Sequence, residues 1–353
     1  MTSRPDRLAD AVAAKGLDAL LITNLPNLRW STGFTGSSGA ALIGPDIRLF
    51  LTDFRYVEQA AEQVPDFERV RTGRDLFADV AERMSGRVGF EDQHVSVRTH
   101  GRLKEAVGDR ADLVGASGIV ESLREVKDAH ELDAMRAAAQ IADQAYAELA
   151  ESGIAARTEK QIAAALEVRM RELGAEDRSF PAIVASGAHG ALPHAVPRDR
   201  PVEHDMFMIV DMGCVVDGYC SDCTRTFATG AVSDAALEVY ELVSRAQLAG
   251  LEAVRAGADC RAVDTVAREI IDAAGHGEHY GHGLGHGVGL EVHEGPRLAQ
   301  TASGALRAGN TVSVEPGVYL PGDLGVRIED LVAVTDDGCE VLTGFTKSLV
   351  TLG

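Results

Sequence analysis

The sequence has few aromatic residues and no cluster of basic ones. Phe, Tyr and Trp make up 5% of its 353 residues, and 34 Lys and Arg stand against 54 Asp and Glu, a formal net charge of −20. Proteins that bind nucleic acids need basic side chains for the phosphates, and those that bind single strands add aromatic rings for the bases. The composition therefore argues against nucleic acid as a partner.

Long apolar runs are missing too. Residues 1–16 carry charges throughout and lack the apolar run of about 7–15 residues of an export signal. Nowhere do about 18 apolar residues follow one another, as a membrane span requires. Five cysteines are too few and too scattered for a disulfide framework. We therefore expect a cytoplasmic protein without a membrane partner.

Two of the cysteines, Cys220 and Cys223, have the spacing of a redox pair. A zinc ribbon would need a second such pair, which the sequence does not have. Because both residues lie in a strand-like segment, packing within a strand is the favoured interpretation and a redox pair is the alternative.

The sequence does have the length and the apolar content, 45%, for two domains. Up to about residue 121, strand-like and helical segments alternate, which predicts a small α/β domain. The expected strands are 17–23, 40–44, 47–52 and 87–91, and the expected helices are 54–63, 76–84 and 99–107. Apolar residues at steps of three and four from Leu132 to Leu149 then predict one long amphipathic helix. We place the N-terminal domain at 1–121 and a second domain at 122–353, with 122–150 as the connecting helix.

The second domain repeats one pattern of elements. Thr158 and Gln161 form a capping box that opens a helix ending at Gly174. Strands are expected at 206–216 and 219–228, helices at 234–255 and 261–274, and strands again at 288–293, 311–315 and 326–334. Helices followed by paired strands, twice over, predict two similar halves around one antiparallel sheet, an α+β domain.

Two acids fall in the first strand pair. Asp211 follows the apolar run Phe207–Val210, where an acid is costly unless it is paired or bound to metal. If Asp217-Gly218 forms a two-residue hairpin turn, Asp211 faces Thr224 and shares its face of the sheet with Asp222. The two acids are then diagonal neighbours, about 7–8 Å apart at the backbone, and like charges that close destabilise a sheet unless cations lie between them. The alternative is that the two acids are surface residues that coincide in position.

The second half supplies one histidine-rich segment and two further acids. Residues 281–289 interleave glycine, which lets the backbone approach a ligand, with histidine, a good metal donor. A glycine-rich turn with unrelated histidines is the alternative. Glu315 ends the strand-like run 311–314, and Glu329 lies within an apolar strand. Arg327 precedes Glu329 by two residues on the same face, so a simple Arg–Glu ion pair is the alternative there.

Together these residues make four carboxylates and one imidazole from one predicted sheet. Such a group could clamp two divalent ions with a reactive water between them, the nucleophile for hydrolysing an amide. Oxygen ligands with one imidazole suit Mn²⁺, Co²⁺, Zn²⁺ or Fe²⁺, and the hard donors favour Mn²⁺. The candidate ligands are Asp211, Asp222, His286, Glu315 and Glu329.

The sequence segments around these five residues resemble those of the pita-bread metallopeptidases, the family of methionine aminopeptidase, aminopeptidase P and prolidase. The resemblance implies the pita-bread fold, with its pseudo-twofold antiparallel sheet, and metal ligation by the same five residues. Residues 27–39 and 52–56 are similar to an N-terminal domain found in the proline-directed branch and in creatinase. Trp30 stands where a tyrosine is usual and Cys223 where a hydrophobic residue is common, and neither belongs to the ligand set. The matching stretches of the second domain are 209–213, 219–226, 285–294, 314–319 and 325–330.

The resemblance also implies roles for further residues. His194 and His293 would contact the reacting part of the substrate, and His282 matches an extra histidine of the proline-directed enzymes. Glu315 would shuttle a proton to the leaving proline nitrogen as well as bind metal. Arg327 is expected to contribute to substrate binding.

We therefore expect an Xaa-Pro aminopeptidase that uses two divalent ions, Mn²⁺ being favoured and Co²⁺ or Zn²⁺ the alternatives. The segment Gly33-Phe34-Thr35-Gly36 favours aminopeptidase P. The nearest alternative is an Xaa-Pro dipeptidase limited to dipeptides, and the more distant one is a binding protein that has kept the fold without catalysis. Relatives of that last kind lack the metal set, whereas this sequence has all of it. The N-terminal domain further implies a homodimer.

Overall fold

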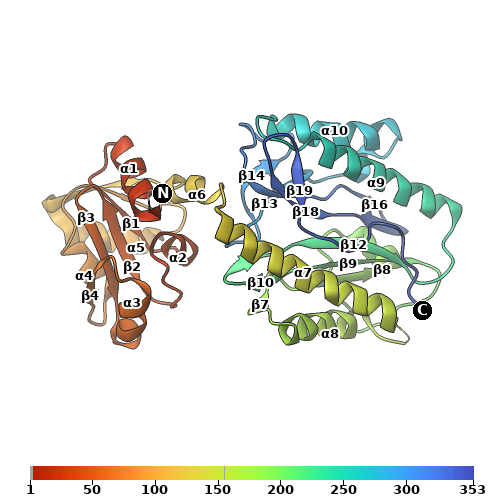
Figure 1. The fold of residues 1–353 in the computed structure, drawn as a ribbon, viewed down its shortest axis with the longest axis horizontal. Helices are drawn as coiled ribbons and strands as arrows, with labels where there is room; N and C mark the ends of the chain where they lie inside the picture. Colours follow the sequence, from red (N-terminus) through yellow and green to blue (C-terminus); the bar gives the residue numbers. More distant parts are fainter. Residues whose placement is uncertain (1–2, 155) are drawn as a thin grey trace. The chain divides into compact units, whose positions relative to one another are not determined.

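The computed structural model describes residues 3–154 and 156–353, which divide into two compact units between Arg124 and Glu125 (Figure 1). None of the helices in the described ranges has the length and apolarity needed to cross a bilayer.

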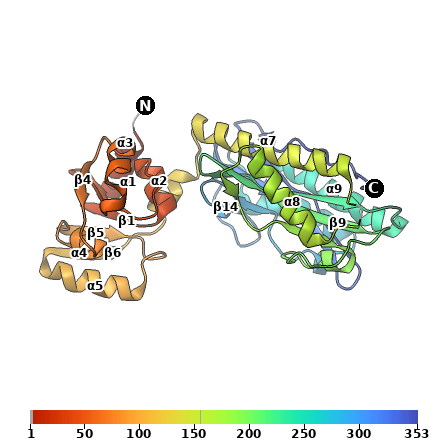
Figure 2. The same ribbon diagram turned by 90° about the horizontal axis from the view of Figure 1, so that it is seen from below.

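The first unit is an α/β domain built on a mixed sheet. In the described part of the chain the strand order is β4-β3-β2-β1-β5-β6, with β2 antiparallel to both of its neighbours. Figure 2 shows α4 and α5 on one face of the sheet and α1 and α2 on the other. The strands are β1 (Ala19–Ile22), β2 (Ala40–Gly44), β3 (Ile47–Thr52), β4 (Glu68–Arg71), β5 (Gly86–Phe90) and β6 (Ala111–Gly115). The helices are α1 (Arg4–Ala14), α2 (Leu25–Thr32), α3 (Val57–Gln63), α4 (Leu76–Ala81), α5 (Val97–Val107) and α6 (Ile119–Arg124).

The sequence pattern predicted the central strands of this sheet and omitted its edges. Strands β4 and β6 are largely exposed or half-buried, so their sequences lack the apolar run by which β1, β2 and β5 were recognised. Helices α1 and α2 were also omitted, although each has a proline in its first turn, where the missing N–H is not needed.

The second unit holds paired helices against antiparallel strands. Its helices are α7 (Ala129–Ser152), α8 (Glu159–Glu172), α9 (Asp234–Ala253) and α10 (Cys260–Ala273). The strands of its first half are β7 (Asp177–Arg178), β8 (Ile183–Ser186), β9 (Phe207–Met212), β10 (Cys214–Val216), β11 (Tyr219–Cys220) and β12 (Cys223–Ala228). Those of its second half are β13 (Gly285–Gly287), β14 (Glu294–Leu298), β15 (Thr311–Val314), β16 (Gly317–Leu320), β17 (Leu324–Arg327), β18 (Asp330–Val334) and β19 (Cys339–Val341).

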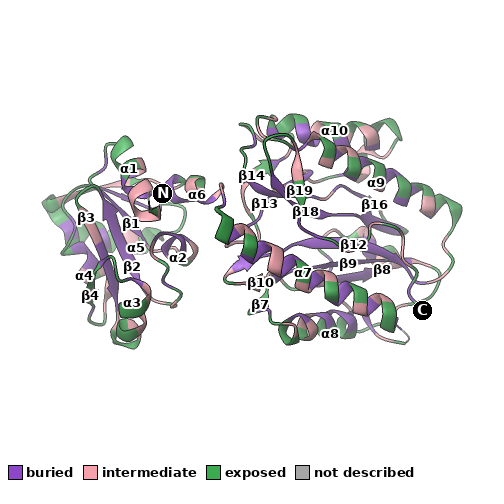
Figure 3. Cartoon of the chain, viewed as in Figure 1, coloured by how far each residue is buried: buried purple, intermediate pink, exposed green. Residues whose placement is uncertain are grey.

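Each half of this unit has its own apolar core beneath its helices. Buried side chains of α7 and α8 pack against β8, β9 and β12, whereas those of α9 and α10 pack against β15, β17 and β18. Figure 3 shows the buried strands between helices whose outer faces are exposed. The capping box at the start of α8 is present, with Gln161 N donating to Thr158 Oγ1 (3.2 Å) and Thr158 N to Gln161 Oε1 (2.9 Å).

The first strand pair has the expected register. Asp217 and Gly218 both adopt positive φ, 45° and 74°, as a two-residue hairpin turn requires. Val216 pairs with Tyr219, and Asp211 pairs with Thr224. The ladder breaks at Gly213, where an added Cβ would lie 1.9 Å from the carbonyl oxygen of Ser221. The expected strands 206–216 and 219–228 are therefore each divided in two.

One expected strand is wrong. Residues 288–293 do not form a strand but connect β13 to β14, which pair antiparallel with a register shift after His286. Glycines allow this connection to fold back tightly: a Cβ on Gly289 would lie 2.3 Å from the Glu294 carboxylate, and one on Gly287 would lie 2.1 Å from the carbonyl oxygen of Gly295. His293 consequently stands at the end of a loop and not within a strand.

The cysteines contribute to packing. All five are free thiols in the described structure, and Cys220 and Cys223 are buried in separate apolar clusters. Cys220 lies in β11 and Cys223 in β12, as the packing interpretation of this pair predicts.

Candidate metal centre

Three buried carboxylates converge in the second unit. Asp211 comes from the end of β9, Asp222 from the link between β11 and β12, and Glu329 from the link between β17 and β18. One oxygen of each lies within 4.8 Å of the others. The hairpin register carries Asp211 and Asp222 to the same place, and β17 and β18 bring Glu329 to them from the other half of the fold.

His286 and Glu315 complete the group. His286, on β13, places Nε2 at 3.2 Å from Glu315 Oε1 and 3.7 Å from Asp222 Oδ2. Its Nδ1 lies 3.1 Å from the carbonyl oxygen of Gly287. Metal-binding histidines usually donate one ring N–H to such an acceptor, which leaves the other nitrogen free for the metal. The structure thus brings together all five predicted ligands.

Hydrogen bonds from the protein reach only some of the carboxylate oxygens in this cluster. Arg327 Nη2 donates to Asp211 Oδ2 (2.7 Å), and the Thr224 hydroxyl donates to Glu329 Oε2 (2.7 Å). Among the described residues, Asp211 Oδ1 and Glu329 Oε1 are buried without a hydrogen-bond partner. Buried carboxylate oxygens without partners are costly, and cations are their usual partners. The donor set therefore fits divalent metal ions.

The electrostatics of the group lead to the same conclusion. Burial and the charges of neighbouring carboxylates raise the pKa of Asp222 and Glu329 well above their usual values. Although burial opposes both charged forms, the contact between His286 and Glu315 lowers the pKa of Glu315 to about 2 and raises that of His286 to about 9. Positive charge is thus strongly favoured at this position, and a metal cation supplies it.

Arg327 does not form the Arg–Glu ion pair that sequence spacing offered as an alternative for Glu329. Its side chain is buried and contacts Asp211, Thr224 and Tyr319 instead. Glu329 is held by Thr224, so the arginine neutralises a neighbouring carboxylate of the same cluster.

A hydrogen-bonded chain extends from Arg327 to His282. Arginine only donates, so Arg327 Nη1 donates to the Tyr319 hydroxyl (2.9 Å), and that hydroxyl donates to His282 Nε2 (2.9 Å). The proton of His282 is then on Nδ1, which lies 2.8 Å from the carbonyl oxygen of Gly283. Burial lowers the pKa of His282, so the imidazole is neutral, as this chain requires.

The other two predicted histidines are exposed beside the group. The His293 ring lies 4.3 Å from the His286 ring, centroid to centroid, at 61°. His194 follows the short helix Gly187–Ala191 and lies close enough to His282 and His293 to interact with both electrostatically. Arg327 Nη1 also donates to the carbonyl oxygen of Pro193 (3.2 Å), which ties the His194 segment to the carboxylate cluster. Both histidines are open to a ligand.

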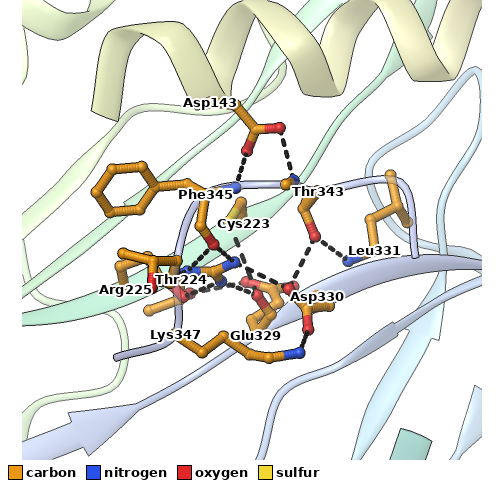
Figure 4. Close-up of polar contacts among 12 residues, drawn as sticks. Asp143, Cys223, Thr224, Arg225, Glu329, Asp330, Leu331, Thr343, Phe345 and Lys347 are labelled. Carbon is orange, nitrogen blue, oxygen red and sulfur yellow. Dashed lines mark hydrogen bonds and ion pairs between the residues drawn. The ribbon is translucent and has the colours of Figure 1, made fainter. Parts of the chain in front are cut away.

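A buried polar network supports the link between β17 and β18 that carries Glu329 (Figure 4). Arg225, on β12, forms an ion pair with Asp330 (2.9 Å) and donates to the backbone carbonyls of Glu329 and Phe345. Asp330 also accepts from Thr343 (2.9 Å) and from Lys347. The C-terminal segment is therefore part of the support of the cluster.

Sequence reasoning gave no role to Thr224, Tyr319, Arg225 or Asp330, which orient the predicted ligands. Thr224 and Arg225 are polar residues that are themselves buried within a fully buried strand, and polar residues in a segment predicted as a strand were the signal that could have identified them.

Comparisons with known proteins agree with this geometry. Residues 133–336 match the profile described as metallopeptidase family M24, and residues 4–126 match the creatinase/prolidase N-terminal domain. The Xaa-Pro dipeptidase of Pyrococcus horikoshii is 32% identical over 358 residues, covering 99% of each chain.

Two solved structures are similar over nearly the whole chain. Xaa-Pro dipeptidase from Bacillus anthracis has a TM-score of 0.96 at 40% identity and covers 99% of both chains. X-Pro aminopeptidase from Thermotoga maritima MSB8 has a TM-score of 0.89 at 38% identity and covers 97% of this chain and 100% of that one.

Proposed function

The chain belongs to metallopeptidase family M24, and we propose that it hydrolyses the Xaa-Pro bond at the N-terminus of peptides. Family membership confirms the resemblance drawn from the motifs, the pita-bread fold and the expectation of a metallo-exopeptidase. It also sets aside the alternative of a non-catalytic binding protein. The observation that carries the proposal is the cluster of acids with partnerless buried oxygens beside exposed histidines.

We propose that Asp211, Asp222, His286, Glu315 and Glu329 hold two divalent ions, with Mn²⁺ favoured by the four carboxylates. When bound, such ions acidify water and polarise the carbonyl of the scissile bond. Co²⁺ and Zn²⁺ are the alternatives, since one imidazole among oxygen donors also suits them.

The protein's own side chains bind the substrate and transfer protons. Glu315 reaches the centre from the end of β15 and is oriented by Ser313, whose hydroxyl lies 3.1 Å from Oε1. We assign it the transfer of a proton to the leaving nitrogen. His293 and His194 hydrogen-bond the substrate amide. His282, which accepts a hydrogen bond from Tyr319, contributes to substrate binding together with Arg327. A proline nitrogen in a peptide bond carries no hydrogen, so the leaving group needs this proton from an acid.

An Xaa-Pro dipeptidase is the second candidate. The relatives at 32% and 40% identity are both named Xaa-Pro dipeptidase, whereas the structure at 38% is an X-Pro aminopeptidase. The aminopeptidase assignment rests on the segment Gly33-Phe34-Thr35-Gly36 of the N-terminal domain. Assaying Ala-Pro against Ala-Pro-Ala with the Mn²⁺-loaded protein separates the two: an aminopeptidase cleaves both, and a dipeptidase cleaves only the first.

We further propose a cytoplasmic homodimer in which residues 1–121 contribute to assembly and residues 122–353 to catalysis. The expected connecting helix 122–150 is divided in the structure, since α6 ends at Arg124 and α7 begins at Ala129. Free thiols support the compartment. Light scattering at micromolar concentration should give twice the chain mass of 37.3 kDa, and a monomer mass would contradict the dimer.

A further inference from the structure

Glu159, the first residue of α8, is a buried carboxylate outside the metal centre. Its side chain is 1% exposed. Oε1 accepts from the backbone N–H and the hydroxyl of Ser186, both at 2.8 Å, and from Arg198 Nη2 at 3.0 Å. Oε2 accepts from the backbone N–H of Arg198 at 3.0 Å and lies 2.9 Å from His189 Nδ1.

Two of these partners, Ser186 and Arg198, stand at the two ends of one loop, and His189 lies within it. Ser186 ends β8 and Arg198 follows Pro197, so the single carboxylate joins both ends of the segment 187–197. The backbone adds further ties at the same place, from Lys160 N to Arg198 O (3.1 Å) and from Glu159 N to Arg200 O (3.3 Å). The helix N-terminus and its first side chain together close this loop.

The loop carries His194 near its middle. Between its ends the backbone carbonyl of Pro193 accepts from Arg327, and Gly190 packs so closely on Gly325 that a Cβ there would lie 1.9 Å from the carbonyl oxygen of Gly190. His194 itself is exposed. Its position is therefore set by the ends of the loop and by the neighbouring Pro193.

We propose that Glu159 is a positioning residue, which fixes the loop 187–197 so that His194 meets the substrate. The inference rests on the proposed function for the role of His194. Burial by itself would raise the pKa of Glu159, but the bonds from Arg198 and Ser186 outweigh burial and lower it, so the carboxylate is ionised in the folded protein. An ionised acceptor holds several donors at once, which an amide in its place cannot do.

Glu167 offers a matched control on the same helix. Its carboxylate also pairs with an arginine, Arg178 (2.7 Å), and accepts a backbone N–H, that of Ala182 (3.0 Å). It contacts neither end of the loop. A substitution at Glu167 therefore shows the effect of losing a similar Glu–Arg ion pair that does not hold the loop 187–197.

Hydrogen exchange tests the positioning without any assay of activity. In Glu159→Gln, exchange of the backbone amides of 187–197 should rise by about tenfold or more, whereas Glu167→Gln should leave them unchanged. Unchanged exchange in Glu159→Gln would overturn the inference. Should Glu159→Gln not fold, Arg198→Ala removes the same pair from its more exposed partner (41% side-chain exposure) and serves in its place.

Kinetics test whether the loop acts through His194. Glu159→Gln should lower kcat/KM for Ala-Pro by about tenfold to 100-fold with metal content unchanged, and Arg198→Lys should retain more activity than Arg198→Ala. In a His194→Ala background the effect of Glu159→Gln should largely disappear, because the two residues act as one unit. An equal effect in both backgrounds would refute the positioning role. If exchange rises but the wild-type, metal-loaded chain does not cleave Ala-Pro, the proposed function fails and the structural role of Glu159 stands.

Discussion

Arg327 donates from Nη2 to Oδ2 of Asp211 over 2.7 Å, while Oδ1 of the same carboxylate is buried without a partner among the described residues. One oxygen of Asp211 is thus satisfied by the protein, and the other has no protein partner, as the proposed metal site requires. Because Arg327 also donates to Tyr319, it links the carboxylate cluster to His282.

Replacing His286 should have a different effect from replacing His293 or His194. His286→Ala removes a donor from the carboxylate cluster and should reduce the metal content measured by elemental analysis. His293→Ala and His194→Ala should retain metal but lose about 100-fold or more in kcat/KM for Ala-Pro, the range for a lost proton-transfer contact. Wild-type turnover in His293→Ala would contradict its assignment to the substrate.

Tyr319→Phe tests the chain between Arg327 and His282. The change removes the hydroxyl that donates to His282 Nε2 and accepts from Arg327 Nη1, both over 2.9 Å. Arg327 Nη1 keeps its bond to Pro193, but His282 Nε2 loses its donor, and an unpaired buried polar group costs about 1–3 kcal/mol, so kcat/KM should fall by about tenfold. Metal content should not change. A kcat/KM equal to that of the wild type would show that His282 does not depend on this contact.

Asp330→Asn should destabilise the fold more than most single substitutions. It leaves Arg225 buried at 3% side-chain exposure without its carboxylate. Breaking a buried pair in this way typically costs about 3–5 kcal/mol of the free energy of unfolding. Urea titration in chelator excludes the contribution of bound metal. The control Glu148→Gln, which removes an ion pair whose partners are 37% exposed, should cost less than about 1 kcal/mol.

The contribution of Glu159 to stability should depend on pH. Its pKa is lowered by folding, because the bonds from Arg198 and Ser186 outweigh burial, so its stabilising contribution is present above its usual value of 4.5 and is lost as pH falls through the folded value. The unfolding free energies of wild type and Glu159→Gln should differ by about 1–3 kcal/mol at pH 7. Their difference should be smaller at pH 3 than at pH 7. A difference that does not change between these pH values would contradict an ionised Glu159.

Local patterns were enough to predict the central elements and the residues that the structure brings together as a candidate metal centre. Asp217-Gly218 fixed a two-residue turn, and the turn fixed the register that pairs Asp211 with Thr224. Acids within apolar runs, such as Glu329, stood out because their burial requires a partner. These predictions needed only residues near one another in the chain.

The hydrogen bonds and ion pairs that hold the candidate site in place could not be predicted, because the residues that form them are far apart in the sequence. Arg225 and Asp330 meet across 105 positions, and Glu159 reaches Arg198 across 39. The connection 288–293 was predicted as a strand because valine and leucine alternate with polar residues there. The close approach of Gly289 to Glu294 overrides that preference.

The central claim is that this chain is a metal-dependent peptidase directed at proline. The most direct test is kcat/KM for Ala-Pro and Met-Ala, measured with the protein stripped by chelator and then reloaded with Mn²⁺. We predict no hydrolysis by the stripped protein and, after reloading, cleavage of Ala-Pro in clear preference to Met-Ala. Preference for Met-Ala, or full activity in protein that elemental analysis shows to be metal-free, would contradict the account.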